Sequence, residues 1–413
     1  MIKPRRCAAA WLLVAAVMPL LASAKPSRIE HSEPLAELQV SADARLSFNA
    51  FSRNFDIELQ PNHALLGALQ RHSLGDEVQV YRGKLKSDDN SWVRIVIAEG
   101  VPRGLVFDGS VLYAIEPVDG SPGADTQPAM FRLADIVIDA GAVQCGSAMP
   151  VGNAAQLFAL VQDDISGTVM QAAGATSQLD VAVIGDFEFT SDKGASAEAE
   201  LITRMNNVDG IFSAQLGVQI NAARIDTYPS NNDPFTNEPD AGELLDELTE
   251  YRRNTPAQNA NGLSHLFTGR NLGGGTAGIA YMNALCSRRF GASLTQATHS
   301  AAVDSLIAAH ELGHNFGAPH DGESGSCSGT PQTFLMAPSI NGSDTFSNCS
   351  ILQMRDDVAG ASCIVAMATS DVAVGAGNSP GAILLGDSAA VSFDVSNAGA
   401  AEVAGVGLDL RVA

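Results

Sequence analysis

Hydrophobic and polar positions alternate along the first third of the chain, and this period of two predicts β-strands. The alternation is clearest in residues 48–59 and in two later runs, 92–97 and 106–115. Glu99-Gly100 follows the run at 92–97, and Asp108-Gly109 falls within the run at 106–115. Both dipeptides favour tight turns. We therefore expect a β-rich N-terminal region over residues 25–176.

After a linker rich in alanine and glycine, strand-like runs alternate with helix-like ones. Strands are expected at 179–187, 218–225 and 264–268, and helices from about 196 to 215 and around 242–248. A further helix is expected from Ser300, a good N-cap residue, because Val303, Leu306 and Ile307 repeat at helical spacing. This βαβαβ order with a helix after it predicts an α/β domain over residues 177–366.

From about residue 369 the chain becomes rich in Gly, Ala, Val and Ser, and the period of two returns. Alternating apolar positions fall in three runs, at 372–374, 391–395 and 406–412. These runs resemble the start of an immunoglobulin-like β-sandwich, a fold that needs about seven strands. Only about four strands are expected here, so residues 367–413 are interpreted as the start of such a module, and the chain is either cut short or ends in an incomplete one.

The first 24 residues have the pattern of a secretory signal peptide. Basic residues precede an apolar run at 8–21, and Ala22-Ser23-Ala24 forms an A-x-A cleavage site. The apolar run is short for a membrane-spanning helix, although a retained membrane anchor is the alternative. No other apolar stretch is long enough to span a bilayer. We expect an exported, extracellular protein without a transmembrane segment.

Composition narrows the set of partners. The 413 residues include 24 basic and 46 acidic side chains, for a formal net charge of −22. Such a chain repels nucleic acid and acidic membranes, so neither is expected as a partner.

The expected helix from Ser300 leads into a pattern with metal-binding chemistry, H-E-x-x-H-x-x-G-x-x-H. His310 and His314 are four residues apart and lie on one helix face, where both imidazoles can bind one ion. Gly317 allows a sharp turn that brings His320 to the same point. Three histidines leave one coordination position for water, which is typical of a catalytic zinc site. Glu311 can then take a proton from that water as a general base.

This pattern resembles the metzincin clan of zinc endopeptidases. Asp321 directly after the third histidine resembles the adamalysin (reprolysin) family, and Met336 stands where the family has a methionine turn. The resemblance covers residues 45–120 weakly and 179–363 well. It implies a twisted mixed β-sheet with an active-site helix and an irregular lower subdomain. It also implies that Met336 forms the floor of the site and that Asp321 braces the lower subdomain.

The family resemblance further implies where substrate binds. Residues 276–281 would form the edge strand above the cleft, and a peptide can add to such an edge as an extra strand. Substrate would contact Gly278, Ile279 and Ala280, and Pro338 would wall the specificity pocket. The alternative is an ordinary edge strand without a ligand. Calcium is a further candidate cofactor, but no motif in the sequence locates its ligands.

The cysteine count suggests an inhibitory role for one thiol. Cys7 leaves with the signal peptide, and the five remaining cysteines are an odd number, so one free thiol is expected. Cys145 is the best candidate. Segments around 81–83, 91–93 and 113–117 resemble the reprolysin prodomain, in which such a cysteine fills the open zinc position. The alternative is an incidental or intermolecularly paired cysteine. The family pattern also suggests two disulfides, Cys286–Cys363 and Cys327–Cys349.

Together these observations predict a secreted zinc endopeptidase that acts on protein or peptide substrates. It would be made as an inactive precursor with its prodomain as an intramolecular inhibitor. The rival interpretation is a non-catalytic adhesin or binding module that keeps the metal site as a fold element. An intact Glu311 argues against the rival, because a purely structural site needs no base.

Overall fold

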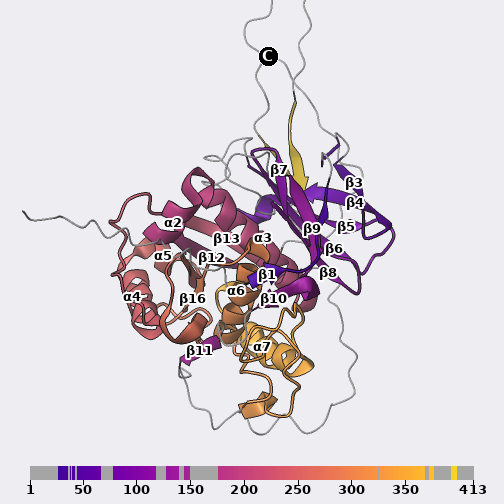
Figure 1. The fold of residues 1–413 in the computed structure, drawn as a ribbon. Helices are drawn as coiled ribbons and strands as arrows, with labels where there is room; N and C mark the ends of the chain where they lie inside the picture. The colour runs from indigo at the N-terminus through magenta and orange to yellow at the C-terminus, as the bar shows by residue number, and fades with distance from the viewer. Residues whose placement is uncertain are drawn as a thin grey trace, which may run out of the picture.

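Two large β-sheets organise the chain: one is formed by strands before residue 133, and the other by β11 (Gln144–Ala148) together with strands after residue 175 (Figure 1). The computed structural model describes residues 27–66 (except 36, 37, 39, 42 and 43), 78–117, 127–138, 144–148, 175–367 (except 324), 372–375 and 392–397. The expected signal peptide lies outside these residues, and so does most of the expected C-terminal module. No helix among the described residues is long and apolar enough to cross a membrane.

The N-terminal sheet is antiparallel, with the strand order β2-β9-β8-β7-β6-β5-β4-β3. Its strands are β2 (Glu33–Pro34), β3 (Arg45–Ala50), β4 (Arg53–Pro61), β5 (Val78–Leu85), β6 (Trp92–Ala98), β7 (Val101–Phe107), β8 (Leu112–Pro117) and β9 (Pro128–Arg132). Glu99 and Gly100 both have positive φ, as the tight turn between β6 and β7 requires. One face of the sheet carries a core of its own, which includes Phe55, Ile57 and Val93.

The second sheet is mixed, with the order β11-β15-β16-β14-β12-β13 and β17 beside β12. Its strands are β11 (Gln144–Ala148), β12 (Ser177–Gly185), β13 (Val218–Thr227), β14 (Leu263–Thr268), β15 (Thr276–Tyr281), β16 (Ala292–Gln296) and β17 (Ile364–Ala366). The strand expected to reach residue 187 ends at Gly185, because the Asp186 side chain accepts a hydrogen bond from Phe189 N and caps the next helix. Phe187 therefore begins a helix, which corrects the sequence prediction.

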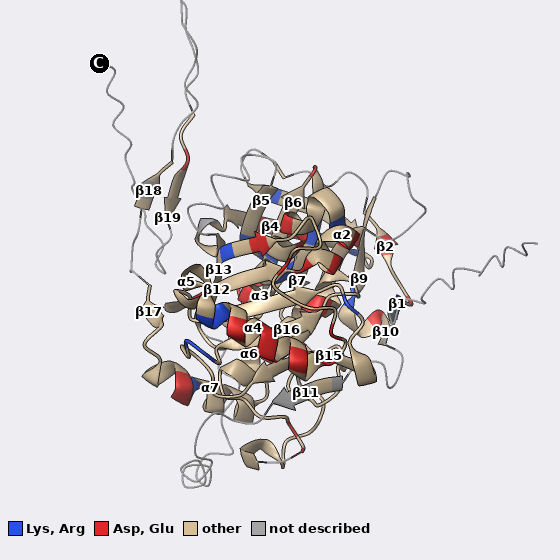
Figure 2. Cartoon of the chain, turned by 90° about the vertical axis from the view of Figure 1, so that its left-hand side faces the viewer, with Lys and Arg blue, Asp and Glu red and all other residues tan. Residues whose placement is uncertain are grey.

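Six α-helices accompany this sheet within the described residues (Figure 1). They are α2 (Phe187–Lys193), α3 (Ala197–Gln215), α4 (Ala241–Asn254), α5 (Pro256–Asn259), α6 (Ala301–Asn315) and α7 (Asn348–Gly360). Short 3₁₀ turns are η1 (His63–Leu65), η2 (Leu133–Asp135), η4 (Gly194–Ser196), η5 (Gly273–Gly275) and η6 (Gly325–Cys327). Acidic positions are spread over several of these helices (Figure 2), in keeping with the negative net charge.

Helix α3 connects the two halves of the molecule, since it contacts β13 and α6 on one side and β6 and β7 on the other. Gly210 lets the N-terminal sheet approach closely, because a Cβ there would lie 2.5 Å from the Trp92 ring. Beside this contact, Arg94 Nε donates to Asp209 Oδ2 at 2.8 Å, and both side chains are buried. One hydrophobic core therefore runs from the N-terminal sheet through α3 to α6.

The segment after α6 is largely irregular and is held by disulfides and buried polar groups. The structure contains the bridges Cys286–Cys363 and Cys327–Cys349, and Cys145 is a free cysteine. Asp321 is fully buried, and its Oδ1 accepts hydrogen bonds from the hydroxyls of Ser347 at 2.8 Å and Ser350 at 3.3 Å. These bonds tie the segment after α6 to the start of α7.

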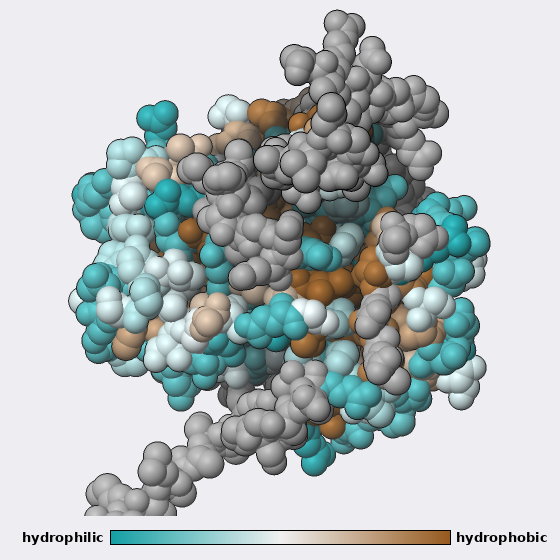
Figure 3. Space-filling view, turned by 90° about the horizontal axis from the view of Figure 1, so that it is seen from above, coloured by the Kyte–Doolittle hydropathy of each residue, from teal (hydrophilic) through white to brown (hydrophobic). Residues whose placement is uncertain are grey.

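Two small β-ribbons complete the described chain. β1 (Ser27–Ile29) pairs antiparallel with β10 (Ile136–Ile138), next to α6 in Figure 1. β18 (Val372–Val374) pairs antiparallel with β19 (Val395–Asn397). The valines of this second ribbon are 40–53 % exposed, so the ribbon does not form a packed sandwich within the described residues. Elsewhere, the view from above shows hydrophilic margins around hydrophobic residues near the middle (Figure 3).

Candidate metal centre

Helix α6 presents two of the expected ligands toward the second sheet. Ser300 caps the helix by accepting from Val303 N, and every residue of α6 is buried. His310 and His314 lie one turn apart. The helix ends at Asn315, and Gly317 turns the chain with a φ of +98°. Glycine suits this conformation, and a Cβ at Gly317 would also lie 2.5 Å from the Asp357 carboxylate and 2.6 Å from the Asn283 amide oxygen, so a larger residue would displace these side chains.

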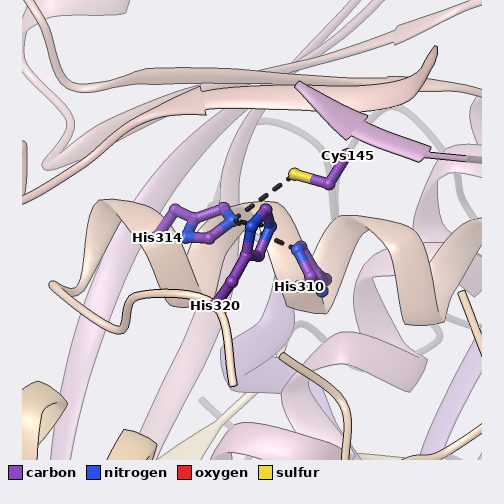
Figure 4. Close-up of side chains that lie close together, drawn as sticks. All are labelled: Cys145, His310, His314 and His320. Atoms are coloured by element: carbon purple, nitrogen blue, oxygen red, sulfur yellow. Dashed lines mark hydrogen bonds between the residues drawn. The ribbon is translucent and has the colours of Figure 1, made fainter. Parts of the chain in front are cut away.

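The turn at Gly317 brings His320 to the two helical histidines, and all three imidazoles point to one place (Figure 4). Nε2 of His314 lies 3.1 Å from Nε2 of His310 and 3.1 Å from Nε2 of His320. Each ring presents its Nε2 to this point because its Nδ1 faces a hydrogen-bond acceptor. The acceptors are Leu335 O at 2.7 Å for His310, Ala318 O at 2.7 Å for His314 and Glu323 Oε2 at 2.8 Å for His320.

These contacts favour neutral imidazoles with a free lone pair on Nε2, since an acceptor at Nδ1 keeps the proton there. Burial lowers the pKa of His310 to about 3 and holds that of His314 well below its ordinary value, and in both cases a neighbouring histidine adds to the effect. Three lone pairs that converge without protons repel one another, so the arrangement calls for a cation.

Cys145 reaches the same point from the N-terminal part of the chain (Figure 4). Its Sγ lies 3.4 Å from Nε2 of His314 and 3.5 Å from Oε2 of Glu311. Burial, followed by the Glu311 carboxylate, raises the pKa of this thiol well above its ordinary value. A cation nearby would be needed to hold it as a thiolate.

The four donors fit zinc. Zinc takes imidazole nitrogen at about 2.0–2.1 Å and thiolate sulfur at about 2.3 Å, so a tetrahedral site places neighbouring nitrogens about 3.3 Å apart. The nitrogen separations of 3.1 Å and the sulfur–nitrogen separation of 3.4 Å are close to these requirements. All four donor atoms lie within 4.8 Å of one another.

Cys145 lies in strand β11, and the position of this strand in the sheet differs from one of the sequence predictions. β15 was expected to be the edge strand, but it pairs with β16 on one side and with β11, in parallel, on the other. Residues 145–147 lie opposite Gly278, Ile279 and Ala280, and Cys145 N donates to Pro338 O at 3.2 Å. The four expected substrate-binding residues thus surround a segment of this same chain.

Glu311 is fully buried beside the histidines, and its Oε1 has no hydrogen-bond partner among the described residues. A Cβ at Gly278 would lie 2.5 Å from this oxygen, so only glycine allows β15 to pass so close to the carboxylate. Burial raises the pKa of Glu311 well above its ordinary value, while the Cys145 thiol lowers it in part. A carboxyl group in this position is suited to hold a proton during a reaction.

Met336 packs against α6, the helix that carries His310 and His314. It is fully buried, and a Cβ at Gly313 would lie 2.7 Å from its sulfur. Its carbonyl accepts from Asp321 N at 2.9 Å, and Asp321 in turn accepts from Ser347 and Ser350. Met336 and Asp321 therefore connect the cluster to the lower part of the domain.

The structure brings two further residues to this region that were not predicted from the sequence. Glu323 faces the third histidine, and its signal was a carboxylate three residues after a ligand. Glu116, from β8 of the N-terminal sheet, accepts a hydrogen bond from Ala302 N at 2.5 Å in the first turn of α6. No local pattern could have indicated this second contact, because the two residues are 186 positions apart.

One helix and the turn after it direct three histidines to one point beside a glutamate, within a mixed α/β domain. This arrangement is typical of metallopeptidases. Residues 175–347 match the family model described as Metallo-peptidase family M12, Reprolysin_5. This segment belongs to the adamalysin/reprolysin type of that family, and the resemblance predicted from the sequence is confirmed for it. The family implies a catalytic zinc.

Two curated relatives are similar over a longer stretch. Disintegrin and metalloproteinase domain-containing protein 11 of Homo sapiens is 24 % identical over a match of 314 residues, and the match covers 69 % of this chain and 40 % of that protein. Disintegrin and metalloproteinase domain-containing protein 19 of Mus musculus is 26 % identical over a match of 313 residues, and the match covers 72 % of this chain and 33 % of that protein. The matches thus span about a third to two-fifths of the length of these relatives.

Proposed function

We propose that this chain is the precursor of a secreted zinc endopeptidase, with Glu311 as the general base and residues 25–176 as an inhibitory prodomain. The observation that carries the proposal is the convergence of three Nε2 lone pairs beside a buried carboxylate with an unpartnered oxygen. A purely structural zinc site is closed by four protein ligands and needs no base, whereas a catalytic one keeps a position for water.

In the proposed mechanism, Glu311 takes a proton from the attacking water and delivers it to the leaving amine. His310, His314 and His320 would hold zinc, which when bound polarises a carbonyl group and makes a water molecule more acidic. Gly278 keeps β15 close to Glu311, so a peptide aligned on β15 would bring its scissile bond near the carboxylate. The buried surroundings strengthen the electrostatic interactions at this point.

The pairing of β11 with β15 supports an extended peptide as the substrate. Backbone groups of β15 that bond to β11 in the precursor would bond to a substrate strand after its removal. Gly278, Ile279, Ala280 and Pro338 would then contact the substrate backbone and one of its side chains. The test is to incubate processed protein with a peptide library, with and without a zinc chelator. Cleavage that the chelator abolishes is expected, and no cleavage by zinc-loaded protein would contradict the proposal.

Inhibition by Cys145 is the first regulatory part of the proposal. In the intact precursor we expect a zinc–sulfur distance of about 2.3 Å in X-ray absorption at the zinc edge. Cys145→Ala should remove that distance and raise peptide hydrolysis above that of the wild-type precursor. A wild-type precursor without any zinc–sulfur distance would contradict the assignment.

A second contact of the N-terminal region with β15 and α6 supports steric inhibition in addition to inhibition by the thiol. Ile136 of β10, together with Ile340, packs against an apolar cluster formed by Ala277 of β15 and by Val303 and Ile307 of α6. Because this contact and the pairing of β11 do not depend on Cys145, the single variant should remain less active than processed protein. Adding Ile136→Ala to Cys145→Ala should raise the activity further. Equal activity in the single variant and the processed protein would contradict this second block.

Attachment of the N-terminal sheet is expected to weaken as the pH rises, because Glu116 is buried against α6 and α3. Burial raises its pKa to about 7, the carboxylates of Glu200 and Asp304 add to this, and Ala302 N and Arg204 oppose it. The docked form therefore keeps a proton that the free carboxyl loses above about 4.5. The contribution of Glu116 to stability is therefore largest below that pH, decreases as the pH rises toward 7, and is smaller by roughly 3 kcal/mol above it.

Glu116→Gln keeps an acceptor for Ala302 N but cannot ionise, so it isolates this effect. We expect the variant and the wild type to unfold at similar urea concentrations at pH 5, and the variant to be the more stable of the two at pH 8. Other titrating groups are common to both proteins and cancel in the comparison. A difference between the two proteins that does not change with pH would contradict the assignment.

A further inference from the structure

We propose that Glu323 is a positioning residue for the third zinc ligand: its carboxylate orients His320 and strengthens zinc binding through the histidine ring. The inference rests on the zinc site of the proposed function and extends it to a residue outside the motif. Its basis is the 2.8 Å contact between Glu323 Oε2 and Nδ1 of His320.

The three ligands differ in what holds their second ring nitrogen. His310 and His314 donate to main-chain carbonyls, which no side-chain substitution removes. For His320 the acceptor described at this nitrogen is a side chain, and it is also a charged one. A carboxylate on the far side of a ligating imidazole fixes the tautomer, holds the ring plane and makes the opposite nitrogen a better donor.

The local chain explains how Glu323 reaches this place. Gly322 has a φ of +77°, and a Cβ there would lie 2.6 Å from Gln332 and 2.9 Å from the Thr330 carbonyl. Gly322 N also donates to Cys327 O at 2.9 Å. The chain therefore turns back directly after Asp321, and the Cys327–Cys349 disulfide ties the far end of this turn to α7.

The burial of the His320 ring distinguishes its contact with Glu323 from an ordinary ion pair on the surface. The His320 side chain is 6 % exposed, whereas that of Glu323 is 49 % exposed. As an exposed ion pair the contact would add little to stability. Acting on a buried ring that binds an ion, the same carboxylate can change metal affinity about 10–100-fold, the range found for outer-shell partners of zinc ligands.

The test compares zinc affinity in the full chain by competition with a chromogenic chelator. Glu323→Ala should raise the zinc dissociation constant about 10-fold or more. Glu323→Gln, which keeps an acceptor oxygen, should recover most of the loss. Asp356→Ala removes an exposed carboxylate from α7 and serves as the matched control. Wild-type affinity in Glu323→Ala, or a loss no larger than that of the control, would overturn the proposal.

A spectroscopic readout separates positioning from a general loss of stability. Nitrogen-edited NMR of the histidine rings in the zinc-loaded chain should give a protected Nδ1–H signal for His320, assigned by its absence in His320→Ala. This signal should exchange rapidly with solvent in Glu323→Ala while those of His310 and His314 persist. An unchanged His320 signal in Glu323→Ala would overturn the proposal. Neither measurement requires peptide cleavage, so failure of the proposed protease activity would be seen separately.

Discussion

Replacing Glu311 with glutamine is expected to slow peptide hydrolysis by processed protein at least ~10²-fold, the scale of lost general-base catalysis. Glutamine has nearly the same shape and can occupy the same space beside Gly278, but it cannot accept a proton from water. The three histidines do not depend on this carboxylate for their orientation, so zinc content should stay at the wild-type value. The measurements are turnover of a fluorogenic peptide and zinc by elemental analysis.

Glu243→Gln, an exposed position in the first turn of α4, is the matched control and should keep wild-type turnover. Near-normal turnover in Glu311→Gln would remove Glu311 from its assigned role. If zinc-loaded wild-type protein cleaves no peptide at all, the rival interpretation as a binding module gains support. These two outcomes differ in the behaviour of the wild type and cannot be confused.

Removing the Arg204 side chain is expected to lower the free energy of unfolding by about 3–5 kcal/mol, the usual loss when one member of a buried ion pair is deleted. Arg204 is almost fully buried in α3, and its Nη2 donates to Asp304 Oδ2 of α6 at 2.8 Å. Its Nη1 also donates to Glu200 Oε2 at 2.6 Å. Burial alone would raise the pKa of Asp304, but Arg204 and then His299 lower it below its ordinary value.

In Arg204→Ala the carboxylate of Asp304 stays buried in the first turn of α6 without its main partner. Urea unfolding of the disulfide-intact chain measures the loss. Arg224→Ala is the control, because Arg224 pairs with Asp226 on β13 but is 37 % exposed, and exposed pairs contribute about 0–1 kcal/mol. If Arg204→Ala loses no more stability than this control, the ion pair does not hold α3 to α6.

Glu311 and Arg204 differ in whether the sequence alone indicates their role. The role of Glu311 as a general base is predicted from its neighbours, since the spacing of the histidines on a helix is a local property. Arg204 has no recognisable motif. It lies in α3, where polar as well as apolar residues are buried. The sequence pattern therefore does not show whether this arginine is buried or exposed to solvent.

The sequence by itself determined the elements whose signals lie within one or two turns of chain. These include the helix that begins at Ser300, the turn at Gly317, the pattern of three histidines and the alternating strands of the N-terminal sheet. The helix begins at Ala301, directly after the predicted cap, because caps and hydrophobic periodicity act over a few residues. The alternating run at 48–59, by contrast, is divided into β3 and β4 by a turn at Phe51 and Ser52, which both have positive φ. The strand expected to end at Phe187 was too long because the capping role of Asp186 was not recognised.

Only the tertiary structure decided which distant segments meet. β11 lies beside β15, Glu116 reaches α6, and the N-terminal sheet covers α3, across sequence separations of about a hundred residues or more. Hydrophobic burial drives such contacts but is not directional, so an alternating pattern indicates a buried face without indicating what covers it. The contact of Glu323 with His320 has only a weak local signal, a carboxylate three residues after a ligand, because it also depends on the turn at Gly322, whose φ is +77°.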